Sequence, residues 1–126
     1  MYKVTKADEA VAYEAKGHYD MLATRLHDGS DVYGDITLGL SHFMPGGGAE
    51  MAEAAKELIY YVVEGEMTVT TDDGSNTVLQ AGDSIHLGAY QGRASRNTGT
   101  VQAQMLVISC PVSELELDCC SRRRKG

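Results

Sequence analysis

The sequence predicts an all-β protein, and three observations support this prediction. Apolar and β-branched residues occur in short runs between Tyr19 and Pro111, and glycine- or aspartate-rich turns separate the runs. The spacing of these runs is typical of a β-sandwich or β-barrel. Only one segment, AEMAEAAKE at residues 49–57, consists of strong helix formers.

The predicted strands follow one another along most of the chain. They cover residues 19–26, 36–44, 58–63, 67–71, 76–80, 81–88 and 101–111. A DGSD turn at 28–31 and a PGGG turn at 45–48 end the first two. Asp72-Asp73-Gly74-Ser75 predicts a hairpin, because Asp-Gly tolerates the positive φ that such turns require.

The segment at 49–57 disagrees with this pattern. Its propensity alone favours a helix of two to three turns, but nine residues are too few for a stable isolated helix. We expect a loop or a short helix that leads into the strand at 58–63.

Length and composition predict one domain over residues 1–126, and the strand pattern with the family resemblance described below puts its barrel at about 20–112 and a C-terminal extension at 113–126. A net charge of -7 argues against nucleic-acid binding, because the basic residues cluster only in the tail Arg122–Lys125. No apolar run is long enough to span a membrane and the N-terminus lacks a signal-peptide core, so we expect a cytoplasmic protein. Cys110, Cys119 and Cys120 fit free thiols, and the role of the last two and of the tail is open.

Two sequence frames resemble the motifs of the small single-domain cupins. Pro45-Gly46 and the ending YYVVEGEM with Gly65 are similar to the two ends of the first cupin motif. Gly82-Asp83 and, fifteen residues after Gly82, Asn97 are similar to the second. The resemblance implies a cupin jelly-roll barrel, in which Asn97 has a structural role.

The positions that hold a metal in this family are all replaced. Counting through the motifs places Ala52 and Ala54 at the two histidine positions, Leu58 at the glutamate position and Arg93 at the third histidine position. None of these side chains can bind a transition metal. The resemblance therefore implies a cupin that has lost its metal site and has no metal cofactor.

A displaced metal site is the alternative. Glu53 and Glu57 lie in the segment where ligands belong, and His42 and His86 are candidate imidazole ligands. No histidine occurs in a His-x-His pair, so such a site needs residues from separate strands. The simpler interpretation is that these glutamates form a solvated surface.

Three residues are the candidate ligand-binding groups. Arg93 would point into the lumen and hold a carboxylate or phosphate, unless it pairs with a carboxylate of the protein or points outward. Tyr60 follows Leu58 on the inward face and offers a hydroxyl. His42 shares its period-2 face with apolar residues and is therefore expected to point inward, as a core residue or as an acid–base group. The side of the sheet on which His86 lies is undecided.

We therefore expect a protein that binds a small anionic metabolite, a carboxylate or phosphate, without a metal. The alternatives are an isomerase, lyase or cyclase that uses histidine and tyrosine as acid and base, or a metal-dependent enzyme with a relocated site. Whether the chain is an enzyme is undecided, since cupins carry many activities. The resemblance also implies a homodimer that pairs through N-terminal strands.

Overall fold

The computed structural model describes residues 1–30 and 35–112, and this part of the chain is mostly β-strand. A three-residue 3-10 helix, η1 (Ala7–Glu9), comes first. The strands are β1 (Val11–Tyr13), β2 (His18–His27), β3 (Thr37–Ala52), β4 (Lys56–Glu64), β5 (Glu66–Thr71), β6 (Asn76–Gln80), β7 (Ser84–Leu87), β8 (Arg93–Arg96) and β9 (Ala103–Pro111). The all-β prediction is confirmed. No helix in the described residues is long and apolar enough to cross a membrane.

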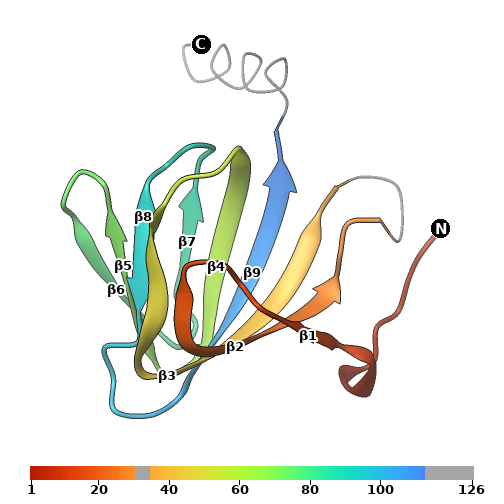
Figure 1. The fold of residues 1–126 in the computed structure, drawn as a ribbon, viewed down its shortest axis with the longest axis horizontal. Helices are drawn as coiled ribbons and strands as arrows, with labels where there is room; N and C mark the ends of the chain where they lie inside the picture. Colours follow the sequence, from red (N-terminus) through yellow and green to blue (C-terminus); the bar gives the residue numbers. More distant parts are fainter. Residues whose placement is uncertain (31–34, 113–126) are drawn as a thin grey trace.

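The strands form one antiparallel sheet that folds back on itself. The order is β6-β5-β8-β3-β9-β4-β7, and β2 adds to β3 and carries β1 at its outer edge. Figure 1 shows β5, β6 and β8 on one side of the molecule and β1, β2 and the start of β3 on the other, with β4 and β9 between. The arrangement is the predicted jelly-roll barrel.

Strand β3 belongs to both halves of the barrel. Its first part, Thr37 to Phe43, pairs with β9, whereas its last part pairs with β8 from Gly48 onward. The crossing requires glycine: a Cβ on Gly47 would lie 2.2 Å from the carbonyl oxygen of Asp20, and one on Gly48 would lie 2.0 Å from that of Ser95. The predicted PGGG turn is therefore a strand segment that passes between two neighbouring backbones.

The short helix at 49–57 is not formed. Residues 49–52 continue β3, and Lys56 and Glu57 already belong to β4. The backbone of Ala49 pairs with both His18 in β2 and Ser95 in β8, and this pairing on two sides overrides the local helix propensity. Only residues 53–55 form the expected loop.

The predicted hairpin turn and the predicted structural role of Asn97 are both confirmed. The Asp72–Ser75 hairpin closes with the Ser75 carbonyl accepting from the Thr71 amide at 3.0 Å, and Gly74 has φ 86°. Asn97 is structural: its side-chain amide donates to the carbonyl oxygens of Phe43 (3.0 Å) and Val101 (2.8 Å). The DGSD turn is described only to residue 30, and Cys119, Cys120 and the basic tail lie outside the described residues.

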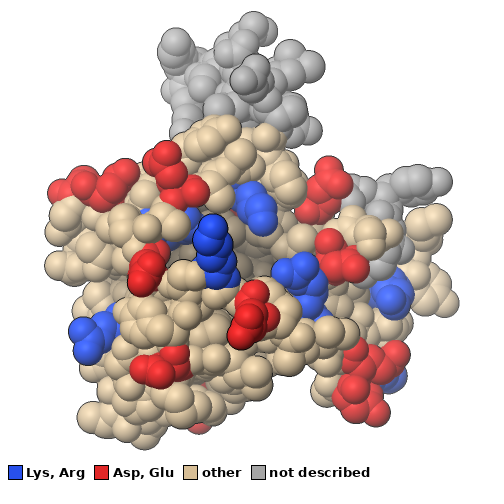
Figure 2. All heavy atoms as spheres, in the orientation of Figure 1, with Lys and Arg blue, Asp and Glu red and all other residues tan. Residues whose placement is uncertain are grey.

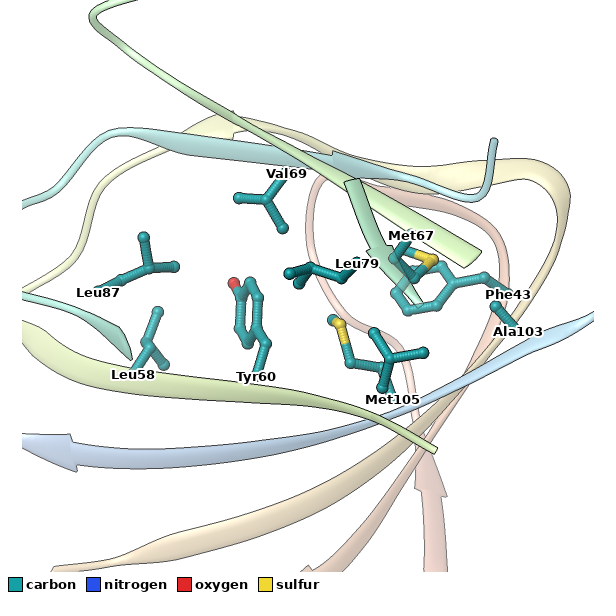
Figure 3. Close-up of a cluster of buried hydrophobic side chains, with 10 residues drawn as sticks. Phe43, Leu58, Tyr60, Met67, Val69, Leu79, Leu87, Ala103 and Met105 are labelled. Atoms are coloured by element: carbon teal, nitrogen blue, oxygen red, sulfur yellow. The ribbon is translucent and has the colours of Figure 1, made fainter. Parts of the chain in front are cut away.

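The apolar core fills one end of the barrel. Phe43, Val62, Met67 and Val69 are at most 1% exposed. Figure 3 shows Phe43 at one end of this cluster, and Leu58 and Leu87 with Tyr60 toward the other. We call the end around Phe43 and Met67 the floor of the barrel, and the end around Tyr60 and Lys56 the mouth.

Charged side chains of both signs are spread over the surface in view. Figure 2 shows acidic and basic groups interspersed on this face. The net charge of -7 therefore does not gather into one acidic patch on this side of the molecule.

Candidate ligand-binding site

The barrel contains a cavity of about 200 Å³ at its mouth. The strand register explains its position, because side chains on the inner face become larger and more apolar toward the floor. The register places Arg25, Gly39, Val107 and Tyr60 in one row across four strands, and Thr37, Ser109 and Leu58 in the row above it. Gly39, Thr37 and Ser109 in these rows are small and leave space, whereas Phe43, Val62 and Met67 fill the floor.

Arg93 lies at this cavity, as the sequence predicts. It shares the inner face of β8 with Ser95, whereas Arg96 points outward and is exposed. Its Nη1 donates to the carbonyl oxygen of Ala52 at 2.7 Å, and its Nε donates to the Tyr60 hydroxyl at 3.4 Å. Both partners are uncharged, so within the described residues no protein carboxylate neutralises the guanidinium.

The four positions that correspond to the metal ligands of the resembling family come together here. Ala54, Leu58 and Arg93 line the cavity, and the carbonyl of Ala52 accepts the Arg93 hydrogen bond. Two methyl groups, an isobutyl group and a guanidinium offer no lone pair to a metal. Among residues 1–30 and 35–112, no cluster of histidine, cysteine, aspartate or glutamate could hold a metal either. The side chains at this place do not fit a metal ion.

The cavity is lined by cations but not by anions. Arg93, Arg25 and Lys56 all line it, and the described lining residues include no aspartate or glutamate. Arg25 also stacks on Tyr13, with its guanidinium carbon 4.2 Å from the ring centroid. Such a site favours negative charge in whatever enters it.

Two buried serines face the cavity without a partner in the described part of the protein. Ser41 is 7% exposed and Ser95 is 5% exposed, both line the cavity, and their hydroxyls make no hydrogen bond within that part. Ser109 differs, because its hydroxyl makes a short hydrogen bond with that of Thr37. Among the described residues, the fully buried side-chain polar atom without a partner is the Nδ1 of His42, so the hydroxyls of Ser41 and Ser95 are accessible from the cavity and can bond to a molecule that enters it.

His18 is a site residue that the sequence did not suggest. It pairs with Ala49, which pairs in turn with Ser95, so His18 shares the inner face and lines the cavity. Its Nδ1 lies 2.9 Å from the carbonyl oxygen of Lys16. A carbonyl only accepts, so Nδ1 donates this hydrogen bond, and Nε2 is left to contact a molecule in the cavity. The signal that could have found it is its place on a strand that pairs with the PGGG segment.

The predicted inward position of His42 is wrong. Its neighbours Ser41 and Phe43 are buried and line the cavity, so His42 points to the outer face of the sheet. The prediction assumed that the apolar residues that alternate from Ile36 to Met44 face the barrel interior, but Ile36, just before β3, and Met44 are 61% and 44% exposed. The Nδ1 of His42 is nonetheless buried and has no hydrogen-bond partner in the described residues.

The other candidates for a displaced metal site also lie outside the barrel. The Nε2 of His86 lies 2.6 Å from Glu57 Oε1 on the outer surface, where the two side chains are 57% and 38% exposed. Glu53 is exposed in the loop before β4. Tyr60, by contrast, is inward and 7% exposed, as predicted.

A second groove, of about 350 Å³, lies between the N-terminal segment and β2. Lys3, Glu9, Arg25 and Asp28 contribute charges of both signs to its lining. Because these charges offset one another, the groove selects for charge less strongly than the lumen does.

Known proteins with related sequences or folds agree with this architecture. A model of the cupin domain family matches residues 39–109. A Mycobacterium tuberculosis (strain ATCC 25618 / H37Rv) protein named beta-D-galactosidase Rv1717 is 37% identical over 115 residues, which is 90% of this chain and 98% of that protein. Among solved structures, the polyketide cyclase RemF from Streptomyces resistomycificus aligns with TM-score 0.74 and 20% identity over 86% of this chain and 79% of that one. A predicted oxalate decarboxylase from Thermotoga maritima aligns with TM-score 0.77 and 16% identity over 87% of this chain and all of that one. At these identities, the two structures support the fold alone.

Proposed function

Since this chain belongs to the cupin family, we propose that it binds a small, hydroxyl-rich organic anion in the lumen of its barrel, with Arg93 as the anchor. The observation that carries the proposal is the partnering of Arg93. Its guanidinium borders the cavity, has only uncharged partners in the described residues and is accompanied by Lys56 and Arg25. A partly buried cation without a counter-ion is best compensated by an anionic ligand.

The geometry of Arg93 suits a carboxylate or a phosphate. Two of its five N–H groups are used by Ala52 and Tyr60, and these bonds hold the planar fork in place. The remaining N–H groups can donate to two oxygens of one ligand group. Because Tyr60 accepts from Arg93, its own O–H is left to donate to the ligand.

Ser41 and Ser95 favour a ligand that carries hydroxyl groups. Ser41 and Ser95 each offer one donor and two acceptor positions, as a sugar hydroxyl does, and neither hydroxyl bonds to residues 1–30 or 35–112. The volume of about 200 Å³ is below the ~300–1,000 Å³ of typical ligand pockets, which favours a small ligand. An acidic monosaccharide combines these properties.

Calorimetric titration with three six-carbon probes tests the proposal. Galacturonate has both the carboxylate and the hydroxyls, galactose lacks the charge, and hexanoate lacks the hydroxyls. We expect galacturonate to bind at least ~10-fold more tightly than either, a difference of about 1.4 kcal/mol. The Arg93→Gln variant should lose the preference for galacturonate over galactose. The Arg96→Gln variant, which alters an outward arginine on the same strand, should keep this preference. Equal affinity of the wild type for galacturonate and galactose would exclude Arg93 as the anchor of an anion.

Hydrolysis of a galactoside is a second candidate, favoured by the name of the 37% identical relative. Most glycosidases use two carboxylates about 5–9.5 Å apart. No carboxylate is among the described residues that line the lumen, and Glu50 lines only the adjoining pocket of about 320 Å³ that shares Arg93 and His18. We therefore place binding ahead of hydrolysis.

Release of nitrophenol from a nitrophenyl β-D-galactoside tests this second candidate. Turnover that falls in Glu50→Gln or His18→Gln but survives in Glu53→Gln, which alters an exposed loop carboxylate, would favour hydrolysis at the mouth of the barrel. No turnover together with galacturonate binding would leave the chain as a binding protein.

A further inference from the structure

A pocket of about 320 Å³ adjoins the lumen at the mouth of the barrel, and we call it the adjoining pocket. Four residues line both it and the lumen: His18, Tyr60, Arg93 and Ser95. The rest of its lining comes from the turn at residues 16–17, the end of β3 and Ala94. The two spaces are therefore neighbouring parts of one hollow, and Arg93 stands where they meet.

A bulge at the end of β3 forms one rim of the adjoining pocket. Ala49 pairs with Ser95 and Ala52 pairs with Arg93, so three residue steps on β3 match two steps on β8. The extra residue interrupts the backbone ladder. It leaves residues 50 and 51 at the rim of the pocket, outside the regular pairing with β8.

The turn at residues 16–17 is tied to this bulge. The backbone amide of Glu50 donates to the carbonyl oxygen of Gly17 at 2.9 Å. Gly17 has φ 73°, a conformation that glycine adopts without strain. Two walls of the adjoining pocket are thus joined by a backbone hydrogen bond before any ligand enters.

The adjoining pocket differs from the lumen in the charge of its lining. Lys16 and Glu50 line it together with Arg93, so it carries charges of both signs. Lys16 and Glu50 are exposed, and their side chains make no hydrogen bond or ion pair with the described residues. A carboxylate accepts hydrogen bonds from hydroxyl groups and an ammonium donates to them. Met51, which is 48% exposed, adds an adaptable apolar surface. This lining suits an uncharged group that has hydroxyls on one side and C–H groups on the other, as a sugar ring has.

The other side of the lumen is less open to a longer ligand. Tyr13 and Arg25 are the described residues that the lumen shares with the groove between the N-terminal segment and β2. They are stacked on each other, with the guanidinium carbon 4.2 Å from the ring centroid. A ligand that extended in this direction would compete with the stacking. Toward the adjoining pocket, Lys16 and Glu50 offer unused hydrogen-bonding groups instead.

We propose that the adjoining pocket is a sugar subsite, which binds a neutral sugar unit linked to the anionic unit in the lumen. The ligand is then an acidic disaccharide unit rather than a single acidic sugar. This inference rests on the proposed binding of an anion at Arg93 and adds a second unit to that ligand. The lumen alone is smaller than the ~300–1,000 Å³ of typical ligand pockets, and the adjoining pocket brings the space into this range.

Calorimetric titration of the full chain with gluconate, lactobionate and lactose tests the inference. Gluconate is a six-carbon anion with hydroxyl groups, lactobionate is gluconate that carries a galactosyl unit, and lactose has two sugar units without a charge. We expect lactobionate to bind at least ~10-fold more tightly than gluconate, because its second unit reaches Lys16 and Glu50. It should also bind at least ~10-fold more tightly than lactose, which has no anion for Arg93.

Substitutions at the rim of the adjoining pocket separate the two units of the ligand. Glu50→Gln and Met51→Ala should each lower the affinity for lactobionate at least ~3-fold, and lower that for gluconate by less. Glu53→Gln is the matched control, because Glu53 is an exposed carboxylate in the following loop that lines neither the lumen nor the adjoining pocket. It should keep the wild-type ratio of the two affinities. Circular dichroism of each variant checks that the fold is intact.

Three results would overturn the inference. Lactobionate that binds no more tightly than gluconate shows that the adjoining pocket holds no second unit. If galacturonate still binds in that case, the proposed function of the lumen stands. Equal losses for gluconate and lactobionate in Glu50→Gln place this carboxylate against the anionic unit. A chain that binds none of galacturonate, gluconate and lactobionate lacks the lumen site and therefore this subsite as well.

Discussion

The floor and the mouth of the barrel use the same strands for different purposes. At the floor, alternate residues of β3, β4 and β5 contribute Phe43, Val62 and Met67, which are fully packed. One row higher, the same strand β3 contributes Ser41 to the cavity. This difference indicates that the packed residues below the ligand site supply most of the folding stability. The mouth can therefore contain charged groups and empty space while the protein stays folded.

The largest expected effect comes from the floor. Met67→Ala removes a side chain that is 0% exposed and leaves a cavity, so it should lower the free energy of unfolding by about 2–5 kcal/mol. Val78→Ala, on the strand that pairs with β5, removes an exposed side chain and should change stability by less than about 0.5 kcal/mol. Urea unfolding followed by circular dichroism measures both. Equal losses would show that the floor is not the main source of stability.

Arg93→Gln should separate binding from stability. The variant removes a partly buried cation that has no protein counter-ion in the described residues, so the free energy of unfolding should change by less than about 1 kcal/mol or rise. Affinity for galacturonate should fall at least ~10-fold in the same preparation, equivalent to about 1.4 kcal/mol. A loss of more than about 2 kcal/mol of stability would instead assign Arg93 a structural role like that of the floor residues.

Substitutions of Ser95 and Ser109 should also separate ligand binding from stability, with smaller effects. Ser95→Ala removes a hydroxyl that makes no hydrogen bond to the described residues, so stability should be unchanged or slightly higher while galacturonate binding weakens by about 0.5–1.5 kcal/mol. Ser109→Ala breaks the bond to Thr37 and should cost about 1 kcal/mol of stability. Thermal unfolding with and without galacturonate measures both effects. Identical behaviour of the two variants would contradict the distinction between a ligand-facing and a structural serine.

The smallest effect lies outside the barrel, at Glu66. Hydrogen bonds from Thr98 and Gln80 hold the pKa of this carboxyl below its ordinary value of 4.5. A carboxyl whose pKa is lower in the folded state contributes stability above pH 4.5, and this contribution is lost as the pH falls through the folded pKa. Melting temperatures measured from pH 6 downward should therefore fall less steeply in Glu66→Gln than in the wild type. Parallel curves would show that these hydrogen bonds do not bias protonation.

The sequence predicts the barrel well because its turns are local. Asp72–Ser75, Gly65 and Gly82 determine where strands end, and no distant residue needs to be known. The motif spacing also predicts that Arg93 and Leu58 meet at one cavity, which the structure confirms.

The orientation of β3 could not be predicted from its own residues. Its apolar side chains Leu40 and Met44 alternate with Ser41 and Phe43, and a rule that places apolar residues inside selects the wrong face. The rule fails because the inner face needs small polar groups at the mouth, while the outer face is itself apolar. His42 was misplaced for this reason, and His18 was missed because its place on the inner face depends on its pairing with Ala49.

The passage of β3 from one half of the barrel to the other also bears on how the molecule opens. Because this strand bonds to β9 through its first half and to β8 through its second, the two halves cannot separate without breaking the backbone ladder that β3 makes with one of them. Native-state hydrogen exchange should therefore give the slowest amides of β5, β8, β9 and β4 one common opening free energy, equal to that of global unfolding. Among the described strands, β1 pairs with β2 alone, and its amides should exchange through a separate local opening that costs much less free energy.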